Sequence, residues 1–173
     1  MIETYNDLKL YLAEDYKANH ISNGLIRGYV GGGGVTVRYV TCLRICEYLL
    51  NTKHRILYYL MKTRLKRMQI KYGIFIEPNT FGYGLWIVHP GGIIVNPKCY
   101  IGNYCVLHHN VTIGNDGKLD IPPRIGNHCF IGANACVIGP LELGNEVTIG
   151  AGAVVTRSYG DRCTLIGVPA HIK

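Results

Sequence analysis

The sequence predicts a mainly β protein, a parallel β-helix built from six-residue repeats and preceded by a short α-helical region. Three observations predict this fold: an aliphatic residue recurs in a six-residue phase, glycine usually follows it, and a small or medium apolar residue stands four places after it. The aliphatic positions are Val95, Ile101, Leu107, Ile113, Ile125, Ile131, Val137, Leu143, Ile149 and Val155. A period of six fits neither a 3.6-residue helix nor a simple strand alternation. It is typical of a solenoid in which one side chain per repeat points into a narrow core.

The N-terminal part of the 173-residue chain predicts helices instead. We expect an α-helical N-terminal region at 1–72 and a parallel β-helix repeat domain at 73–173. Asn6 or Asp7 is the expected N-cap of a first helix that runs to about Lys17. The glycine run 31–34 predicts a flexible joint, or a loop passing close to another backbone, because consecutive glycines are poor helix formers.

A second helical pattern extends from 35 to about 70, with an interruption at Asn51 and Thr52. Residues 35–72 hold nine basic side chains against one acidic side chain, Glu47. The favoured interpretation is a solvated basic face, with the apolar side on the β-helix or on a neighbouring subunit. Peripheral contact with an anionic membrane through 35–72 is the alternative. Nucleic acid is not an expected partner, because no recognised binding module accompanies the charge.

The repeat is irregular in two places. Counting back by sixes from Val95 gives His89, Tyr83 and Glu77, none of them aliphatic. The first coil must therefore be irregular, or its phase must change near the prolines at 78 and 90. Residues 115–123 interrupt the phase again with a polar run and two prolines, which predicts a loop that leaves the coil.

The cysteines indicate a reducing compartment. Three of the seven, Cys99, Cys105 and Cys129, occupy the small inward position of the repeat and are interpreted as small core hydrophobes. No pair has the spacing of a zinc site, and the odd total argues against a full set of disulfides. No apolar run has the length of a membrane span, and the acidic start is not typical of a signal peptide. The expected location is the cytoplasm. The basic segment 35–72 keeps the inner face of the membrane as an alternative location.

Three histidines are the main candidates for chemistry. His89 interrupts the aliphatic phase and is followed by Pro90-Gly91-Gly92, which removes bulk around it. If a coil holds three repeats, His108 and His109 stack near His89 on the next coil. Imidazole has an ordinary pKa near 6.5, so it can take a proton from an alcohol at neutral pH. A metal site built from these three histidines is not expected, since no carboxylate or thiolate at suitable spacing completes it.

From about Gly73 onward the chain resembles the hexapeptide-repeat acyltransferases, and among them it is most similar to the serine acetyltransferase group. The segments that carry the resemblance are 73–78 (GIFIEP), the His89 segment, 111–114 (VTIG) with the loop after it, 149–155 (IGAGAVV) and 167–170 (GVPA). The resemblance implies a left-handed parallel β-helix assembled as a homotrimer. It also implies acetyl-CoA as co-substrate, in a groove between two subunits.

The same resemblance implies roles for single residues. His89 is expected to be the general base, and His109 is a second catalytic candidate. The small residues of the later coils are expected to let the pantetheine arm lie against the backbone. The loop after Gly114 is expected to cover the thiol end. The candidate CoA-binding residues are Gly114, Asn115, Ala133, Ala151, Gly152, Arg157, Gly167, Pro169 and Lys173.

The chain also departs from the serine acetyltransferase pattern. Val88 and Phe75 stand where that group has two aspartates, and Ile121-Pro122 stands where it has an Arg-His pair. A free amino acid carries a carboxylate and an ammonium, and each is costly to desolvate without a partner. The missing partners favour a less charged acceptor. The short N-terminal region and the His-Pro-Gly-Gly corner resemble relatives associated with bacterial surface polysaccharide synthesis.

The predicted function is therefore an acetyl-CoA-dependent O-acetyltransferase with direct transfer to a hydroxyl. The expected acceptor is a sugar of a surface polysaccharide or of its precursor. One alternative is a serine O-acetyltransferase of cysteine biosynthesis. A second is a non-catalytic β-helix scaffold that serves only assembly or partner binding.

Overall fold

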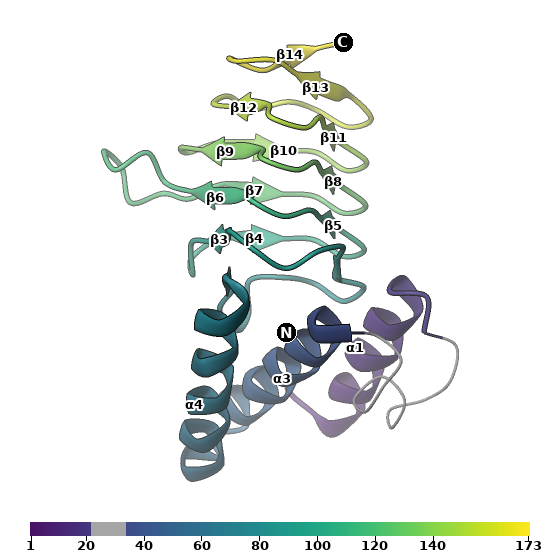
Figure 1. The fold of residues 1–173 in the computed structure, drawn as a ribbon, viewed down its shortest axis with the longest axis vertical. Coiled ribbons are helices and arrows are strands. Elements are labelled where there is room, and N and C mark those ends of the chain that lie inside the picture. Colours follow the sequence, from purple (N-terminus) through teal and green to yellow (C-terminus); the bar gives the residue numbers. More distant parts are fainter. Residues whose placement is uncertain (22–33) are drawn as a thin grey trace.

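The computed structural model describes residues 1–21 and 34–173, and it consists of helices followed by a stack of short strands (Figure 1). The described helices are α1 (Tyr5–Ala18), α3 (Gly34–Asn51) and α4 (Arg55–Tyr72). The glycine run predicted as a joint lies outside the described residues, apart from Gly34. The strands are β1 (Ile74–Phe75), β2 (Trp86–Ile87), β3 (Ile93–Val95), β4 (Tyr100–Ile101), β5 (Val106–Leu107), β6 (Thr112–Gly114), β7 (Arg124–Ile125), β8 (Phe130–Ile131), β9 (Cys136–Ile138), β10 (Glu142–Leu143), β11 (Thr148–Ile149), β12 (Val154–Val155), β13 (Thr164–Ile166) and β14 (His171–Ile172).

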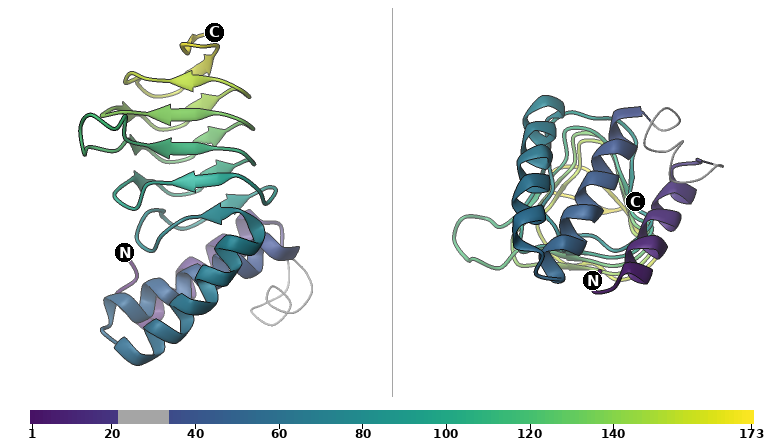
Figure 2. Two further views of the ribbon diagram at one scale, coloured as in Figure 1. Left: turned by 60° about the vertical axis from the view of Figure 1, so that its left-hand side comes forward. Right: turned by 90° about the horizontal axis from the view of Figure 1, so that it is seen from below.

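The strands form a three-sided prism. One side is the five-stranded sheet β1-β3-β6-β9-β12, the second is β10-β7-β4, and the third is the six-stranded sheet β14-β13-β11-β8-β5-β2. Every strand pair is parallel except β13 with β14, which closes the C-terminal end of the stack. Seen from below, the coils lie over one another around a common axis (Figure 2). The predicted parallel β-helix is thus confirmed.

The core of the prism is the aliphatic column that the sequence predicts. All ten aliphatic positions of the six-residue phase are buried. The residues four places after eight of them are buried as well; these are Cys99, Cys105, Val111, Cys129, Ala135, Leu141, Val147 and Ala153. The seven cysteines are all free. The polar stretch 115–123 joins β6 to β7 and projects from the prism (Figure 1), as the prolines predict.

The first coil follows a different phase, as expected. Ile87 rather than His89 points into the core, and His89 is exposed at the corner after β2. The pairing of Trp86 with Val106 spans 20 residues, whereas Ile94 pairs with Thr112 over 18. The longer corner is made possible by Gly91 and Gly92, which have φ of 109° and 65°.

The helices form a base under the first coil (Figure 2). The N-cap of α1 is Thr4 rather than Asn6 or Asp7; Asp7 instead completes a capping box by accepting from the Thr4 backbone N–H. Side chains of α3 and α4, such as Leu43, Cys46 and Leu65, share one hydrophobic core with the prism. The division into domains at 72/73 stays a prediction, although α4 does end at Tyr72 and β1 begins at Ile74.

One basic residue of 35–72 is not on a solvated face. Arg44 is fully buried between α1, α3 and the first coil, so the expectation of a wholly exposed basic face is wrong at this position. Its guanidinium donates to Asp15 and Glu47 and to the backbone carbonyls of Phe81 and Gly82. None of the helices in the described ranges is both long and apolar enough to cross a membrane.

Candidate active site

Five of the predicted site residues, His89, His109, Ala133, Ala151 and Gly152, lie on one edge of the prism, where the six-stranded sheet turns into the five-stranded sheet. We call this the histidine edge; its corner segments are 88–92, 108–111, 132–135 and 150–153. Backbone hydrogen bonds connect the successive corners. Asn110 N–H donates to Gly91 O (2.8 Å), Asn134 N–H to His109 O (3.1 Å) and Gly152 N–H to Ala133 O (2.8 Å). The edge is therefore a continuous backbone ladder from the first coil towards the C-terminal end.

His89, His108 and His109 come together at the lower end of this edge. The ring centroids of His89 and His108 are 6.3 Å apart, those of His89 and His109 6.1 Å, and those of His108 and His109 6.5 Å. The predicted cluster is present, although it is brought together by the 20-residue offset and not by an 18-residue coil. His128, interpreted from sequence as a surface residue, stacks on Tyr104 at a different corner.

The three imidazoles lack acidic partners. In the described ranges 1–21 and 34–173 no carboxylate is hydrogen-bonded or ion-paired to any of them, and no group of histidine, cysteine and acidic residues is arranged to hold a metal. The Nδ1 atom of His109 is buried without a hydrogen-bond partner among the described atoms. Partial burial, reinforced by the neighbouring His89 and His109 rings, lowers the pKa of His108. The lowered pKa of His108 favours its neutral imidazole, the form that can accept a proton.

The next coils along the edge carry small side chains. Ala133 is half-buried, and Ala151 and Gly152 are exposed one coil further on. At Gly152, with φ of 69°, the space where a Cβ would stand is open. The edge above the histidines is consequently smooth, and an extended chain of atoms could lie directly against the backbone.

The remaining CoA candidates are divided between two other places. Gly114, Asn115 and Arg157 lie on the opposite border of the five-stranded sheet, after β6 and β12. Arg157 Nε donates to the Tyr159 hydroxyl (2.8 Å), and that hydroxyl donates to Ala170 O. This contact brings Arg157 next to the 167–170 turn that holds Gly167 and Pro169.

Lys173 does not join this group. It follows β14 at the end of the six-stranded sheet, where its N–H donates to Thr164 O. The loop candidate Asn115 contacts Asp120 within the projecting loop, and Asp120 is also paired with Lys98.

One aromatic neighbour of the cluster, Phe130, was not singled out from the sequence. Its ring lies 5.1 Å from the His108 ring, centroid to centroid. Phe130 precedes the inward residue Ile131, so the sequence predicts that its side chain points outward. Its proximity to His108 depends on the coil offset of 24 residues between β5 and β8, which the sequence does not fix.

Comparison with known proteins shows which proteins the chain is similar to. Residues 122–157 match the family model described as the hexapeptide repeat of succinyl-transferase. The chain is 32% identical over 136 residues to a serine acetyltransferase of Synechococcus elongatus, covering 77% of this chain and 54% of that protein. It is 31% identical over 170 residues to that of Buchnera aphidicola, covering 96% and 59%.

Solved structures give the same result. The serine acetyltransferase of Neisseria gonorrhoeae matches with a TM-score of 0.80 at 28% identity, covering 97% of this chain and 65% of that one. The soybean serine acetyltransferase apoenzyme matches with a TM-score of 0.81 at 26% identity, covering 97% and 69%. The predicted fold, a left-handed parallel β-helix after a short helical region, is confirmed.

The chain is accordingly similar, over residues 122–157, to a hexapeptide-repeat model and, over most of its length, to proteins named serine acetyltransferase. It spans between half and three fifths of the length of the two curated relatives above. The roles of single residues in catalysis and in CoA binding stay predictions.

Proposed function

We propose that this chain is an acetyl-CoA-dependent O-acetyltransferase with His89 as its general base and the hydroxyl of serine as its acceptor. The observation that carries the proposal is the histidine cluster at one end of an edge whose next two corners carry glycine or alanine at every position except Asn134. The names of the relatives support the reaction class and favour serine, the alternative in the sequence analysis, over the sugar acceptor that was the main prediction. A sugar acceptor has no support from these comparisons.

Acetyl-CoA supplies the acetyl group as a thioester. A neutral imidazole of His89 takes the proton of the acceptor hydroxyl as its oxygen attacks the acetyl carbonyl. The C–S bond breaks, and the imidazolium returns the proton to the departing sulfur. His109, 6.1 Å from His89 between ring centroids, is proposed to orient the acceptor or the base through its unpaired Nδ1.

The proposed CoA path follows the histidine edge. The pantetheine arm lies against Ala133, Ala151 and Gly152, since these side chains leave the backbone accessible. Arg157, beside the turn with Gly167 and Pro169, is proposed to meet a phosphate of the nucleotide end. Lys173 is a weaker candidate because it follows β14 over another sheet. A homotrimer, in which the loop from Gly114 and Asn115 covers the thiol end of CoA in a groove between subunits, remains part of the proposal.

The test of the base compares two histidine variants. His89→Asn should lower kcat by about 10²- to 10⁴-fold, the usual worth of general-base catalysis, and leave CoA affinity nearly unchanged. His128→Asn is the matched control, because that residue stacks on Tyr104 away from the cluster and asparagine tolerates its φ of 56°. Full activity of His89→Asn would refute the assignment of the base.

The acceptor is tested separately. Free thiol released from acetyl-CoA is measured with serine and with a panel of sugars. Rapid thiol release with serine supports the proposal. Release only with sugars would contradict it and would favour the sugar acceptor predicted in the sequence analysis. A protein that binds no CoA in calorimetry would instead be the scaffold of the second alternative.

A further inference from the structure

The outer face of α4 differs from the surface of an ordinary solvated helix. Only Leu65 and Gln69 of this helix are buried, and they point towards α3 and the first coil. On the opposite side, Ile56, Leu60 and Ile70 are 80%, 65% and 67% exposed. Figure 2 shows α4 at the edge of the molecule, with α3 between it and α1. The helix thus presents large apolar side chains on the side that the rest of the described chain does not cover.

Three of these exposed positions lie on one stripe. Ile56, Leu60 and Ile70, with Thr63 and Arg67 between them, follow one another at steps of four and three residues, so they lie on a single line along the helix. We call this line the α4 stripe. At about 1.5 Å per residue, its 14 steps from Ile56 to Ile70 span roughly 21 Å. Tyr59, which is also exposed, widens it.

Basic residues border the stripe on both sides. Arg55 and Lys66 lie on one flank, and Arg64 and Lys71 lie on the other, as a turn of 100° per residue requires. The helix contains six basic residues and no acidic residue. An apolar stripe between two basic flanks is the arrangement of a helix that lies in the interface of an anionic lipid surface.

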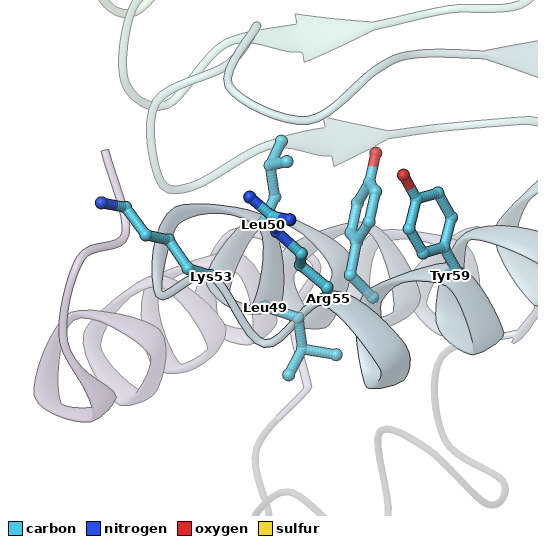
Figure 3. Close-up of a pocket in the computed structure, with 6 residues that line it drawn as sticks. Leu49, Leu50, Lys53, Arg55 and Tyr59 are labelled. Atoms are coloured by element: carbon cyan, nitrogen blue, oxygen red, sulfur yellow. The ribbon is translucent and has the colours of Figure 1, made fainter.

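A separate hollow lies at the turn between α3 and α4. It has a volume of about 400 Å³ and is lined by Leu49, Leu50, Lys53, Arg55, Tyr58 and Tyr59. Figure 3 shows Arg55 between Lys53 and Tyr59, with the Lys53 side chain directed away from Tyr59. Two cations and two tyrosines around one hollow suit a phosphate headgroup, because Tyr is favoured at the boundary between headgroups and acyl chains.

We propose that α4 is a membrane-docking helix, which lays the α4 stripe on the surface of a bilayer that contains anionic lipids. A two-fold contact of α4 with α4 of a second copy would bring together two faces that carry only positive charge, and like charges in contact are repulsive. A contact of α4 with a different face of a neighbouring subunit, as in the proposed homotrimer, is separated from the bilayer by the assembly experiment below. An anionic bilayer matches both the apolar stripe and its basic flanks.

The experiment is co-sedimentation of the whole chain with vesicles. The chain should bind vesicles of phosphatidylcholine mixed with phosphatidylglycerol, bind phosphatidylcholine alone only weakly, and lose affinity as salt is raised. Lys66→Gln with Arg67→Gln should weaken binding by about 30-fold, since each basic residue near such a surface is worth about fivefold. Glutamine preserves helix propensity, and a circular dichroism spectrum checks the fold.

Lys9→Gln with Arg162→Gln is the matched control. It removes one lysine and one arginine, as the test variant does, from exposed positions on α1 and on the β-helix. The control should bind vesicles almost as well as the unaltered chain. An equal loss in the control, or no binding of the unaltered chain to anionic vesicles at low salt, would overturn the proposal.

A further variant separates the bilayer from a second copy. Ile56→Gln with Leu60→Gln should reduce vesicle binding and leave the mass of the lipid-free assembly unchanged in sedimentation. If this variant instead lowers the mass of the lipid-free assembly, the stripe is an interface between copies and the membrane proposal is wrong.

Discussion

Replacement of Arg44 by methionine tests how the helices are fixed to the β-helix. Arg44 Nε is 2.8 Å from Asp15 Oδ2, and its Nη1 atom is 3.1 Å from Glu47 Oε2 and 2.9 Å from Phe81 O. Asp15 also accepts from the N–H of Leu85 (2.8 Å), the residue before β2. This network therefore joins α1 and α3 to the strand that leads to His89.

The expected cost of Arg44→Met follows from burial. Both carboxylates are almost fully buried, so removal of the guanidinium leaves two charges without a cation and two carbonyls without a donor. Breaking a buried ion pair in this way costs about 3–5 kcal/mol. In a chain of this size each kcal/mol shifts Tm by roughly 2–4 °C, which gives a decrease of about 6–20 °C.

The assay is thermal unfolding at one fixed protein concentration, because assembly would otherwise change Tm. Lys17→Met is the control, since it breaks an exposed pair with Glu14 that is worth about 0–1 kcal/mol. A triple variant, Asp15→Asn, Arg44→Met and Glu47→Met, should recover most of the loss, because an uncharged network carries no unpaired charge. A decrease below about 3 °C for Arg44→Met alone would refute the reasoning.

Three further predictions concern the histidine edge. The lowered pKa of His108 means that its imidazole binds a proton less readily in the native state than in the unfolded chain, so stability falls as pH drops below about 6.5. The Tm of His108→Gln should therefore decrease less than the Tm of the unaltered chain between about pH 7.5 and 5.5, and an equal decrease would contradict this reasoning. Ala151→Gln should raise KM for acetyl-CoA, with Ala151→Ser as the conservative control and with Tm unchanged, because residue 151 is exposed. Gly92→Ala should lower kcat, because its Cβ would lie 2.1 Å from Asn110 Oδ1 at a φ of 65°; a variant with full activity would show that this corner tolerates displacement.

The regular part of the fold could be predicted because one repeat determines it. The aliphatic phase identified every inward residue from Val95 to Val155, and the two prolines at 122 and 123 identified the projecting loop. Each repeat has the same local environment, so a six-residue pattern is enough to place its side chains.

The helical base was harder to predict, because its decisive contacts are tertiary. Arg44 and Glu47, three residues apart, have the spacing of an exposed helical ion pair, yet both are buried. Asp15, 29 residues earlier in the chain, is what makes burial of the guanidinium tolerable, and no local pattern connects it with Arg44. The N-cap was misjudged for a similar reason: Thr4 and Asp7 cap each other, so either could be assigned from propensity alone.

The candidate site lies where the repeat departs from its own rule. A uniform repeat gives every corner the same small residues, and such corners can accommodate a ligand but offer no acid or base. The three imidazoles meet because the corner after β2 is two residues longer than a regular one, which sets His89 against His108 and His109. The loop between β6 and β7, on the opposite border, likewise adds six residues to its coil and leaves the register intact, since Ile101 still pairs with Ile125, 24 residues on instead of 18. The cluster at the histidine edge therefore depends on a longer corner that leaves the core pairing unchanged, and core stability and catalytic geometry should be separable by mutation.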